Sequence, residues 1–591
     1  MKLSRNQTWV ILVGLLLFGY FVRVLHVGDQ SIWGDEAFTY AVIRAENFWG
    51  TLARDVHPFL YFMMITQWTR FAGINELSLR YPSVLASTVD LALFYIFAKE
   101  ALRHRSASKQ WFVPLVAVLL LALADLDIQI SQEARSYTLH IAWILLSFIA
   151  YLKWLRTDKR LWAVVFVISN ALIVYTHYIG VFTPIAIGVH ALLFLRGKQR
   201  IFAFAMLVSS ALLVIPWVLL VLSQQVDKFA ADAVAAFPSS WATLWALRSS
   251  WLTQQWAFML GLAMLGLITM TPQNRLKIRP FRASSFLFIV LLIPLGLAFL
   301  SNLWLPTLYD YRISQITPAI VLLMAFGLAN FQREARLFFL VVIVIYGVFS
   351  VDVYRPKEPW REFGQMVAEF AQDGDAVLLE FTGGDYTMDY YLERYLPTYI
   401  PTVSMWQWRT FEPQTYESGL LGTLDSYDSI WLARWSSDNE AFIKLRATNH
   451  SPTMRRTIEQ GAVQFELYRF DRLSDESLVT FENGMILQQA TIYAGQVDLW
   501  WSANHSIDAN YTVSIKVFDS AGNIIAQIDR QPQLESRPTA TWQADEIIYD
   551  PYLLETNGMS VTVQVYLWTP DGIQPVATVD SQGEFSIPES R

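Results

Sequence analysis

The chain has 591 residues, of which 54% are hydrophobic and only 16% are charged. This length is too great for a single hydrophobic core, so we expect several domains. The composition, with 23 Trp and 38 Phe, is typical of a membrane protein rather than of a soluble enzyme. A net charge of −7 without a basic tract argues against nucleic acid as a partner, and the absence of cysteine excludes disulfides and Cys-ligated metals.

Long apolar runs alternate with short polar gaps from the N-terminus to Tyr354, and no later run is long enough to cross a bilayer. A spanning helix needs about 20 mostly apolar residues. The first run, Trp9–Val27, is longer than the core of a signal peptide and lacks its cleavage pattern, so we predict a retained transmembrane helix. We expect about eleven spans in all, near residues 9–28, 82–102, 111–129, 137–155, 161–176, 179–196, 201–222, 251–271, 283–304, 314–331 and 336–354.

The distribution of lysine and arginine predicts how these spans are oriented. If the N-terminus is cytoplasmic, every loop on the inner side carries basic residues, whereas the loops on the other side carry few. Cytoplasmic loops of membrane proteins collect Lys and Arg. We therefore expect a multi-pass protein of the cytoplasmic (plasma) membrane, with its C-terminal part extracytoplasmic.

Three domains follow from the changes in pattern along the chain. Residues 1–354 form the predicted transmembrane domain, which includes a long first external loop, 29–81, with two amphipathic stretches expected to lie along the interface. Residues 355–475 mix helical patterns with short apolar strands and predict a small α/β domain. Residues 476–591 read as alternating strands and predict a β-sandwich. The predicted fold class is a polytopic α-helical membrane protein carrying these two smaller domains.

Two adjacent carboxylates, Asp35 and Glu36, follow the first span directly. Charge beside hydrocarbon is costly unless it is paired or used. One interpretation is structural: Asp35 would cap a helix by accepting backbone N–H bonds, and Glu36 would favour the helix dipole. The other is catalytic, because a carboxylate can take a proton from a hydroxyl nucleophile. Residue type alone leaves both interpretations open.

Four more polar clusters lie on the same predicted side of the membrane. Each alone is typical of interfacial anchoring, because Tyr, Trp, His and Arg favour that depth. The two arginines, however, stand where the positive-inside rule does not favour them. The clusters contain Asp55 with His57, Arg135 with Tyr137, His177 with Tyr178, and Arg312 after Tyr309-Asp310-Tyr311.

Taken together, the clusters offer carboxylates, imidazole and at least two cations at the outer leaflet. Cations beside His and Tyr suit an anionic phosphate headgroup. A lipid with its apolar tail in the bilayer and its phosphate at the surface would use each of these groups. Transfer of a sugar from a lipid-linked phosphate fits this description, although spacing identifies neither the sugar nor the acceptor.

Four motifs follow the opening helix in order: Gly34-Asp35-Glu36, Asp55-Val56-His57-Pro58-Phe59-Leu60-Tyr61, Ser131-Gln132-Glu133-Ala134-Arg135-Ser136-Tyr137 and Thr176-His177-Tyr178. The set resembles the bacterial members of the protein mannosyltransferase-like family. These are polytopic glycosyltransferases of the C superfamily, related to the aminoarabinose transferases of lipid A. The resemblance covers roughly residues 1–355. It departs at Phe59, where the family usually has a second proline, and this change affects helix entry more than chemistry.

The resemblance implies an inverting glycosyltransferase that uses a polyprenyl-phosphate sugar donor at the outer face of the cytoplasmic membrane. Asp35 matches the proposed base and Glu36 its neighbouring acid. The donor phosphate would be bound by Arg135, Tyr137, His177 and Arg312, with Asp55, His57 and Tyr178 in support. The acceptor would be a hydroxyl of a glycan, a lipid or a protein.

Two other classes of function compete with this one. A transporter or flippase of a lipid-linked glycan also needs polar groups in a membrane cavity, but it usually shows internal repeats and charge near the midplane. A structural or adhesion protein would use mainly its outer sandwich, whose role is either carbohydrate binding or support.

No closed metal motif is present, although Asp35, Glu36 and His57 could contribute to a divalent-metal site.

Overall fold

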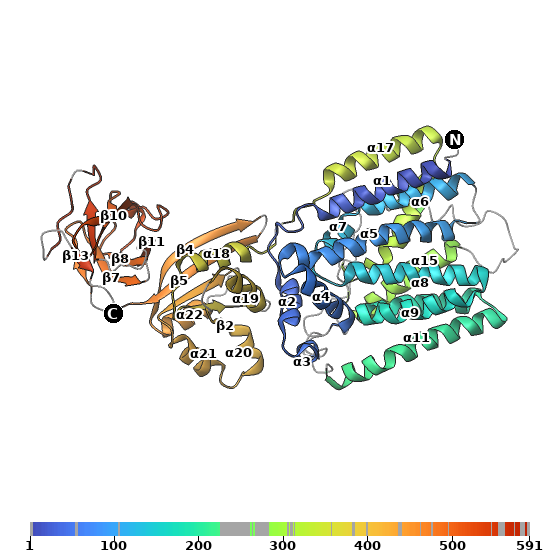
Figure 1. Ribbon diagram of the computed structural model, residues 1–591, viewed down its shortest axis with the longest axis horizontal. Coiled ribbons are helices and arrows are strands. Elements are labelled where there is room, and N and C mark those ends of the chain that lie inside the picture. The colour runs from blue at the N-terminus through green and yellow to red at the C-terminus, as the bar shows by residue number, and fades with distance from the viewer. Residues whose placement is uncertain are drawn as a thin grey trace. The chain divides into compact units, whose positions relative to one another are not determined.

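The computed structural model divides the chain into two compact units (Figure 1). The helical unit comprises Met1–Gln30 and Phe38–Arg355, and the sheet unit comprises Ser31–Ala37 and Pro356–Arg591. The structure describes residues 4–53, 57–103, 107–224, 261–262, 264–265, 283–303, 307, 311–312, 314–355, 357–380, 384–396, 400–434, 440–460, 463–473, 477–493, 496–519, 521–544, 546–553, 562–572, 574–579 and 585–587.

The helical unit is built of apolar helices joined by short turns. Contacts join α5 to α8, α8 to α9, and α1 to both α5 and α6, so that buried side chains from these helices form one large core. Its elements are α1 (Arg5–Val24), α2 (Gly34–Arg44), α3 (Phe48–Ala53), α4 (Phe59–Ala72), α5 (Glu76–Ala101), α6 (Ala107–Ala122), α7 (Asp125–Ser131), α8 (Tyr137–Thr157), α9 (Arg160–Thr176), η1 (Tyr178–Val181), α10 (Phe182–Phe194), α11 (Gly197–Gln224), α15 (Ala283–Ser301), η2 (Ser314–Ile316), α16 (Thr317–Leu328) and α17 (Arg333–Ser350). Of these, α2 begins within the sheet-unit segment Ser31–Ala37.

By length and composition, four helices among the described residues can each cross a membrane: α1, α5, α8 and most of α11. A fifth span forms if α6 and α7, which meet at a bend of 58°, are counted as one. Shorter apolar helices coincide with further predicted spans, including α9 and α16. The multi-pass membrane fold is therefore as predicted, whereas the number eleven stays a prediction. The predicted span 251–271 lies almost wholly outside the described residues.

Hydrogen bonds from a buried arginine stabilise the bend between α6 and α7. A helix that stops inside a membrane leaves carbonyl oxygens without partners, and this is costly in hydrocarbon. The fully buried guanidinium of Arg23 donates to the carbonyl oxygens of Leu121 and Ala122, each at 3.1 Å. It also donates to Ser87 Oγ at 2.7 Å. An arginine of α1 thus caps the broken end of α6.

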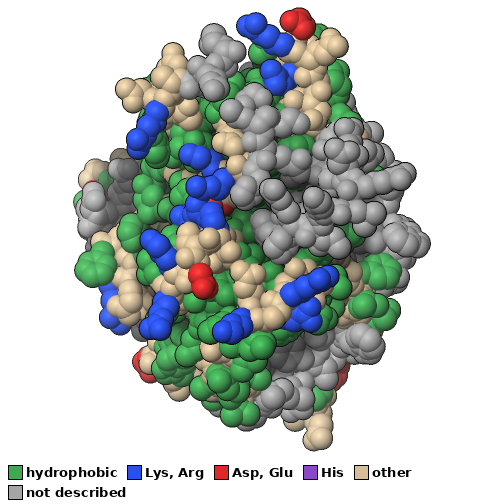
Figure 2. Space-filling view, turned by 90° about the vertical axis from the view of Figure 1, so that its right-hand side faces the viewer, with side chains coloured by type: hydrophobic (Ala, Val, Ile, Leu, Met, Phe, Trp, Pro, Cys, Tyr) green, Lys and Arg blue, Asp and Glu red, His purple; other side chains and the backbone are tan. Residues whose placement is uncertain are grey.

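One face of the molecule is rich in basic side chains. Figure 2 shows Lys and Arg spread across the face at the end of the helical unit, with apolar surface between them. Exposed basic residues lie in the turns α8–α9 and α10–α11, among them Lys159, Arg160, Arg196 and Lys198. The sequence predicts that these turns are cytoplasmic.

The sheet unit contains a five-stranded mixed sheet with helices packed against it. The strand order is β2-β1-β3-β5-β4, in which β1 pairs in parallel with β2 and β3 while β5 pairs antiparallel with β3 and β4. This region comprises α18 (Trp360–Phe370), β1 (Ala376–Leu379), α19 (Gly384–Tyr395), β2 (Thr402–Ser404), α20 (Met405–Phe411), α21 (Tyr416–Leu424), β3 (Ser429–Arg434), α22 (Glu440–Ala447), β4 (His450–Gln460) and β5 (Val463–Arg472). The mixture of helices and strands predicted for 355–475 is present.

Two four-stranded antiparallel sheets follow, in the orders β10-β9-β12-β13 and β11-β8-β7-β6. Inward side chains from both sheets, such as Trp501 and Val565, belong to one hydrophobic cluster. The strands are β6 (Val479–Thr480), β7 (Met485–Tyr493), β8 (Gln496–Ala503), β9 (Thr512–Phe518), β10 (Ile524–Arg530), β11 (Ile548–Leu553), β12 (Thr562–Trp568) and β13 (Phe585–Ile587), with the short helix η3 (Thr539–Thr541) between β10 and β11.

A buried arginine joins the two parts of the sheet unit. Arg469 on β5 donates to Asp471 Oδ1 at 2.9 Å and to Ser429 Oγ at 3.1 Å. Its guanidinium lies 4.0 Å from the ring centre of Tyr549 on β11. The regions predicted as two separate domains therefore share a buried polar contact within one compact unit.

Candidate functional site

The first group of predicted site residues lies in the helical unit, around the turn before α8. Arg135 is 3% exposed, and its Nη2 donates to Nε2 of His57 at 2.7 Å. Its backbone is fixed from two sides, because Ser83 Oγ donates to the Arg135 carbonyl and Thr39 Oγ1 donates to the Ala134 carbonyl. The structure therefore brings together two of the sequence-predicted residues that lie 78 positions apart.

The aromatic and imidazole rings of further predicted site residues lie close to one another. The Tyr137 ring lies 5.9 Å from the ring of His177 and 5.1 Å from that of Tyr311. Arg312 lies 5.9 Å from the ring centre of Tyr311. Tyr178 is half-buried, and its hydroxyl accepts a hydrogen bond from Trp217 Nε1 at 3.1 Å.

The charged groups around His177 shift its pKa. Burial lowers the pKa of His177 well below its usual range, and four nearby groups, the side chains of His140, His57, Arg312 and Arg135, lower it further. His177 is therefore neutral at physiological pH. The same motif also contains an acidic residue: Glu133, whose side chain is buried, lies two positions before Arg135 in the sequence.

His140 belongs to this group, although the sequence analysis did not select it. Its ring lies 5.5 Å from that of His177, and its side chain is 2% exposed. It follows Tyr137 by three residues in α8, so both lie on one face of the helix. A histidine inside an apolar span, one turn after a selected tyrosine, was the available signal.

An apolar groove of about 940 Å³ lies between α4, α5 and α8. Two of its lining residues are Thr138, in the first turn of α8, and Ser83, which donates to the Arg135 backbone carbonyl. The other lining side chains come from α4, α5 and α8 and are nearly all apolar, including Met64, Leu85, Val89, Trp143 and Leu146. The groove suits a hydrocarbon chain, and the hydrogen bond from Ser83 links its wall to the backbone of Arg135.

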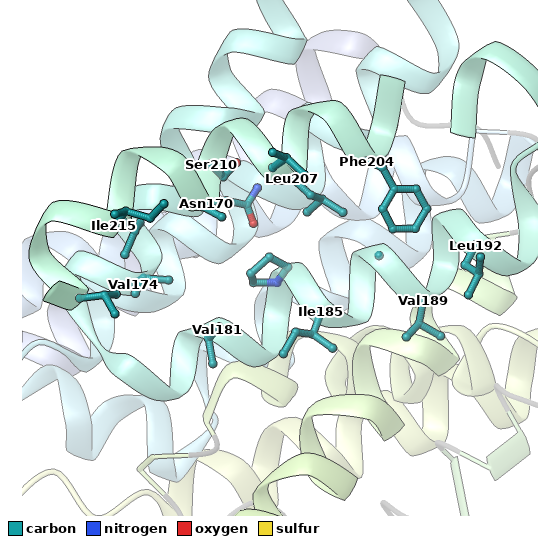
Figure 3. A pocket seen from close by; sticks show the side chains of 16 residues that line it. Asn170, Val174, Val181, Ile185, Val189, Leu192, Phe204, Leu207, Ser210 and Ile215 are labelled. Carbon is teal, nitrogen blue, oxygen red and sulfur yellow. The ribbon is translucent and has the colours of Figure 1, made fainter. Parts of the chain in front are cut away.

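A second groove, of about 690 Å³, lies between α9, α10 and α11 (Figure 3). Figure 3 shows Asn170 and Ser210 among apolar side chains such as Val174, Leu207 and Phe204. No predicted site residue lines this groove.

The carboxylates Asp35 and Glu36 belong to the sheet unit and stand in the first turn of α2. Asp35 is half-buried. Glu36 is fully buried, and its Oε2 accepts from Lys357 Nζ at 3.0 Å and from the backbone N–H of Trp33 at 3.4 Å. Lys357 was not selected from the sequence; a basic residue soon after the last span, on the predicted outer side, was the available signal.

Some predictions fall outside this description. Asp55 lies outside the described residues, as do Tyr309 and Asp310. Within the described part of the chain, no three His, Asp or Glu side chains gather in a way that could hold a metal ion. The carboxylate of Glu36, one of the possible metal ligands, is paired with Lys357 instead.

The architecture is similar to that of a solved structure. ArnT from Cupriavidus metallidurans, solved bound to undecaprenyl phosphate, aligns over 79% of this chain and 98% of its own, with 12% identity and a TM-score of 0.55. The oligosaccharyltransferase from Archaeoglobus fulgidus, solved with zinc and sulfate, aligns over 78% and 73%, with 12% identity and a TM-score of 0.48. Neither a family model nor a curated protein sequence matches the chain. At these identities the similarity establishes the fold alone.

Proposed function

We propose that this chain is an inverting membrane glycosyltransferase that moves a sugar from a polyprenyl-phosphate carrier to a hydroxyl acceptor. The observation that carries the proposal is the Arg135–His57 pair together with an apolar groove of about 940 Å³, whose lining residue Ser83 donates to the Arg135 carbonyl. A lipid phosphate needs both a cation for its headgroup and an apolar surface for its chain. ArnT, whose fold this chain shares, was solved with such a lipid.

In the proposed reaction, Asp35 takes the proton of the acceptor hydroxyl, and the oxygen attacks the anomeric carbon of the sugar. The bond from that carbon to the phosphate oxygen breaks on the opposite side, which inverts the configuration and releases polyprenyl phosphate. Arg135 and Arg312 offset the charge that grows on the leaving phosphate, and neutral His177 with Tyr137 completes its binding site. His57 and Tyr178 support these groups, as does Asp55. These steps require only side chains of this chain.

We further propose the cytoplasmic membrane as its location, with about eleven spans and the basic face of Figure 2 on the cytoplasmic side. In this arrangement residues 1–354 form the transferase domain. Residues 355–475 and 476–591 form the extracytoplasmic α/β part and β-sandwich. The acceptor is a glycan, lipid or protein hydroxyl reached from the outer face.

Release of polyprenyl phosphate from labelled polyprenyl-phosphate sugars tests the proposal, with purified protein in detergent and membrane extract as acceptor. Wild type should release the lipid, and Asp35→Asn should lower turnover by ~10²–10⁴-fold. Asp29→Asn serves as the matched control, because Asp29 is exposed and pairs with His26 in the same external region. Full activity of Asp35→Asn would reject the assigned base. No release by wild type with any donor would favour a transporter or flippase of lipid-linked glycans.

A further inference from the structure

A buried ion pair within the sheet unit joins Glu36 to the start of the α/β part. Glu36 is fully buried, Lys357 is 13% exposed in its side chain, and the two charged atoms lie 3.0 Å apart. The ammonium group also lies 5.9 Å from the ring centre of Trp33, within the range of a cation–π contact. A buried charge is retained in a fold only when it is paired, so each member of this pair depends on the other.

The same carboxylate fixes the beginning of helix α2. The first helical hydrogen bond runs from the Ala37 N–H to the Trp33 carbonyl, which makes Trp33 the N-cap residue and Glu36 the third helical residue. Glu36 Oε2 accepts from the N–H of Trp33, as the third residue does in a capping box. Asp35, one position earlier, is therefore oriented by a turn whose geometry depends on Glu36.

The α/β part holds the residues before this turn as well. The backbone N–H of Ile32 donates to the Tyr391 hydroxyl at 2.8 Å. Ser31 Oγ donates to Glu362 at 3.3 Å and accepts from the Arg361 N–H at 3.2 Å. The segment Ser31–Glu36, which comes from the first external loop, is thus bound by residues more than 300 positions later in the sequence.

Three carboxyl groups share this neighbourhood. Burial raises the pKa of Glu358; the charges of Glu36 and Asp35 raise it further, and Lys357 opposes them. Lys357 is a cation that the structure places among these acids. Its removal would take a bonded positive charge away from the fully buried Glu36, which is costly.

We propose that Lys357 is the positioning residue for the carboxylate turn: by binding Glu36 it orients Asp35, so that Glu36 is a structural partner rather than a second catalytic acid. This inference rests on the proposed function for the role of Asp35, and on the contacts within the sheet unit for the rest. It assigns the extracytoplasmic α/β part a direct task in catalysis, which is to hold the loop that carries the base.

The experiment compares four full-length variants in detergent: Lys357→Met, Lys357→Arg, Glu36→Gln and the double variant Lys357→Met with Glu36→Gln. Lys444→Met is the matched control, because Lys444 is also buried in the sheet unit and pairs with a glutamate, Glu417. Each is assayed for release of polyprenyl phosphate from polyprenyl-phosphate sugars, and for hydrogen exchange of residues 31–44 by mass spectrometry.

Lys357→Met should lower kcat by ~10²-fold through misplacement of the base, with little change in the KM for the donor. It should also accelerate exchange across residues 31–44. Lys357→Arg and the double variant should recover most of the activity, because one keeps the cation and the other removes the unpaired charge. Glu36→Gln should lose far less activity than Asp35→Asn, and Lys444→Met should match wild type in both measurements.

Two results would overturn the inference: unchanged kcat and exchange in Lys357→Met, or a loss in Glu36→Gln as large as that in Asp35→Asn. If wild type releases no polyprenyl phosphate, the proposed function fails, and hydrogen exchange alone decides whether Lys357 holds the turn. Faster exchange of residues 31–44 in Lys357→Met would then support the anchoring, and unchanged exchange would reject it.

Discussion

Arg135 donates a hydrogen bond of 2.7 Å to Nε2 of His57. An imidazole nitrogen accepts a hydrogen bond only when it carries no proton, so the pair requires the Nδ1–H form of His57. This contact fixes the orientation of the Arg135 guanidinium. In the proposed function, the oriented guanidinium binds the donor phosphate.

Replacing Arg135 with methionine should raise the KM for the polyprenyl-phosphate donor and lower kcat/KM by roughly 10²-fold or more, because a charge-assisted contact to the phosphate is lost. The conservative variant Arg135→Lys should keep part of the activity, since a lysine side chain supplies the charge but not the paired donors. The measurement is donor-dependent release of polyprenyl phosphate.

The control for this prediction is Arg70→Met. Arg70 lies in α4, is exposed and donates to Gln67 three residues earlier, so its loss should leave the kinetics unchanged. If Arg135→Met kept the wild-type KM and kcat while remaining folded by thermal unfolding, the donor phosphate would have to bind elsewhere.

The approach of His140 to the turn before α10 depends on a glycine. A Cβ atom at Gly180 would lie 2.4 Å from Ile173 Cγ2 and 2.5 Å from His140 Cε1. Gly180→Ala should therefore push His140 and Ile173 away, cost about 1–3 kcal/mol of stability, and reduce transfer by displacing His140 from His177. Thermal unfolding and polyprenyl-phosphate release check both effects.

Gly188→Ala is the matched control in the same hairpin region. A Cβ at Gly188 would meet only Leu207 Cδ1, at 3.4 Å, which is an ordinary contact. Because alanine favours a helix over glycine, this variant should be as stable as wild type or slightly more stable. Equal behaviour of the two variants would show that the close packing at Gly180 relaxes without consequence.

Much of the fold could be predicted from the chain because apolar periodicity and length are local properties. The predicted spans near 9–28 and 137–155 correspond to α1 and α8 with shifts of a few residues at their ends. The run predicted at 111–129 is instead broken near Leu123, where the chain bends by 58° between α6 and α7. Asp125 and Asp127 interrupt the apolar run just after the break, but the arginine that caps the broken end comes from another helix, α1, and no local pattern could reveal it.

The candidate site shows the same division between local and distant information. The pair Asp35 and Glu36 stood out by residue type, and the catalytic and capping interpretations both remained open. The structure gives Glu36 a capping contact and an ion pair with Lys357, 321 positions later, which no local pattern encodes. The contact between Arg135 and His57 likewise follows from the packing of the turns before α4 and α8, and the motifs alone could only place the two on one predicted side.

Asp375 makes the stability of the sheet unit depend on pH. Burial raises the pKa of Asp375 from an ordinary value of 3.8 to about 6, although the nearby charge of Arg469 and the Trp431 N–H bond lower it. The native state therefore binds the proton more readily than the unfolded chain between about pH 4 and 6. Stability should fall as pH rises through this window, by roughly 3 kcal/mol for this group.

Thermal unfolding of the full-length protein at several pH values between 4 and 7 tests this sign, followed by tryptophan fluorescence because Trp431 donates to Asp375. Asp375→Asn should flatten the profile, leaving the part contributed by Asp550, whose pKa is also raised by burial to about 6. Asp508→Asn, at an exposed position, should leave the profile unchanged. A profile in Asp375→Asn as steep as that of wild type would contradict the assignment.

The last prediction concerns Arg23 and separates two roles for an arginine inside the bundle: capping of carbonyl groups and interaction with buried acids. Besides capping α6, its guanidinium is close enough to the buried side chains of Asp90 and Asp127 for an electrostatic interaction. Arg23→Met should therefore destabilise the protein by roughly 3–5 kcal/mol, since it leaves the α6 carbonyls without donors and removes a positive charge near two buried acids. Thermal unfolding in detergent measures the loss, with the exposed Arg5→Met of the same helix as control. If adding Asp127→Asn to Arg23→Met restores stability, pairing of charge dominates. If the double variant is no more stable than Arg23→Met, capping of the Ala122 carbonyl is the main role of the arginine.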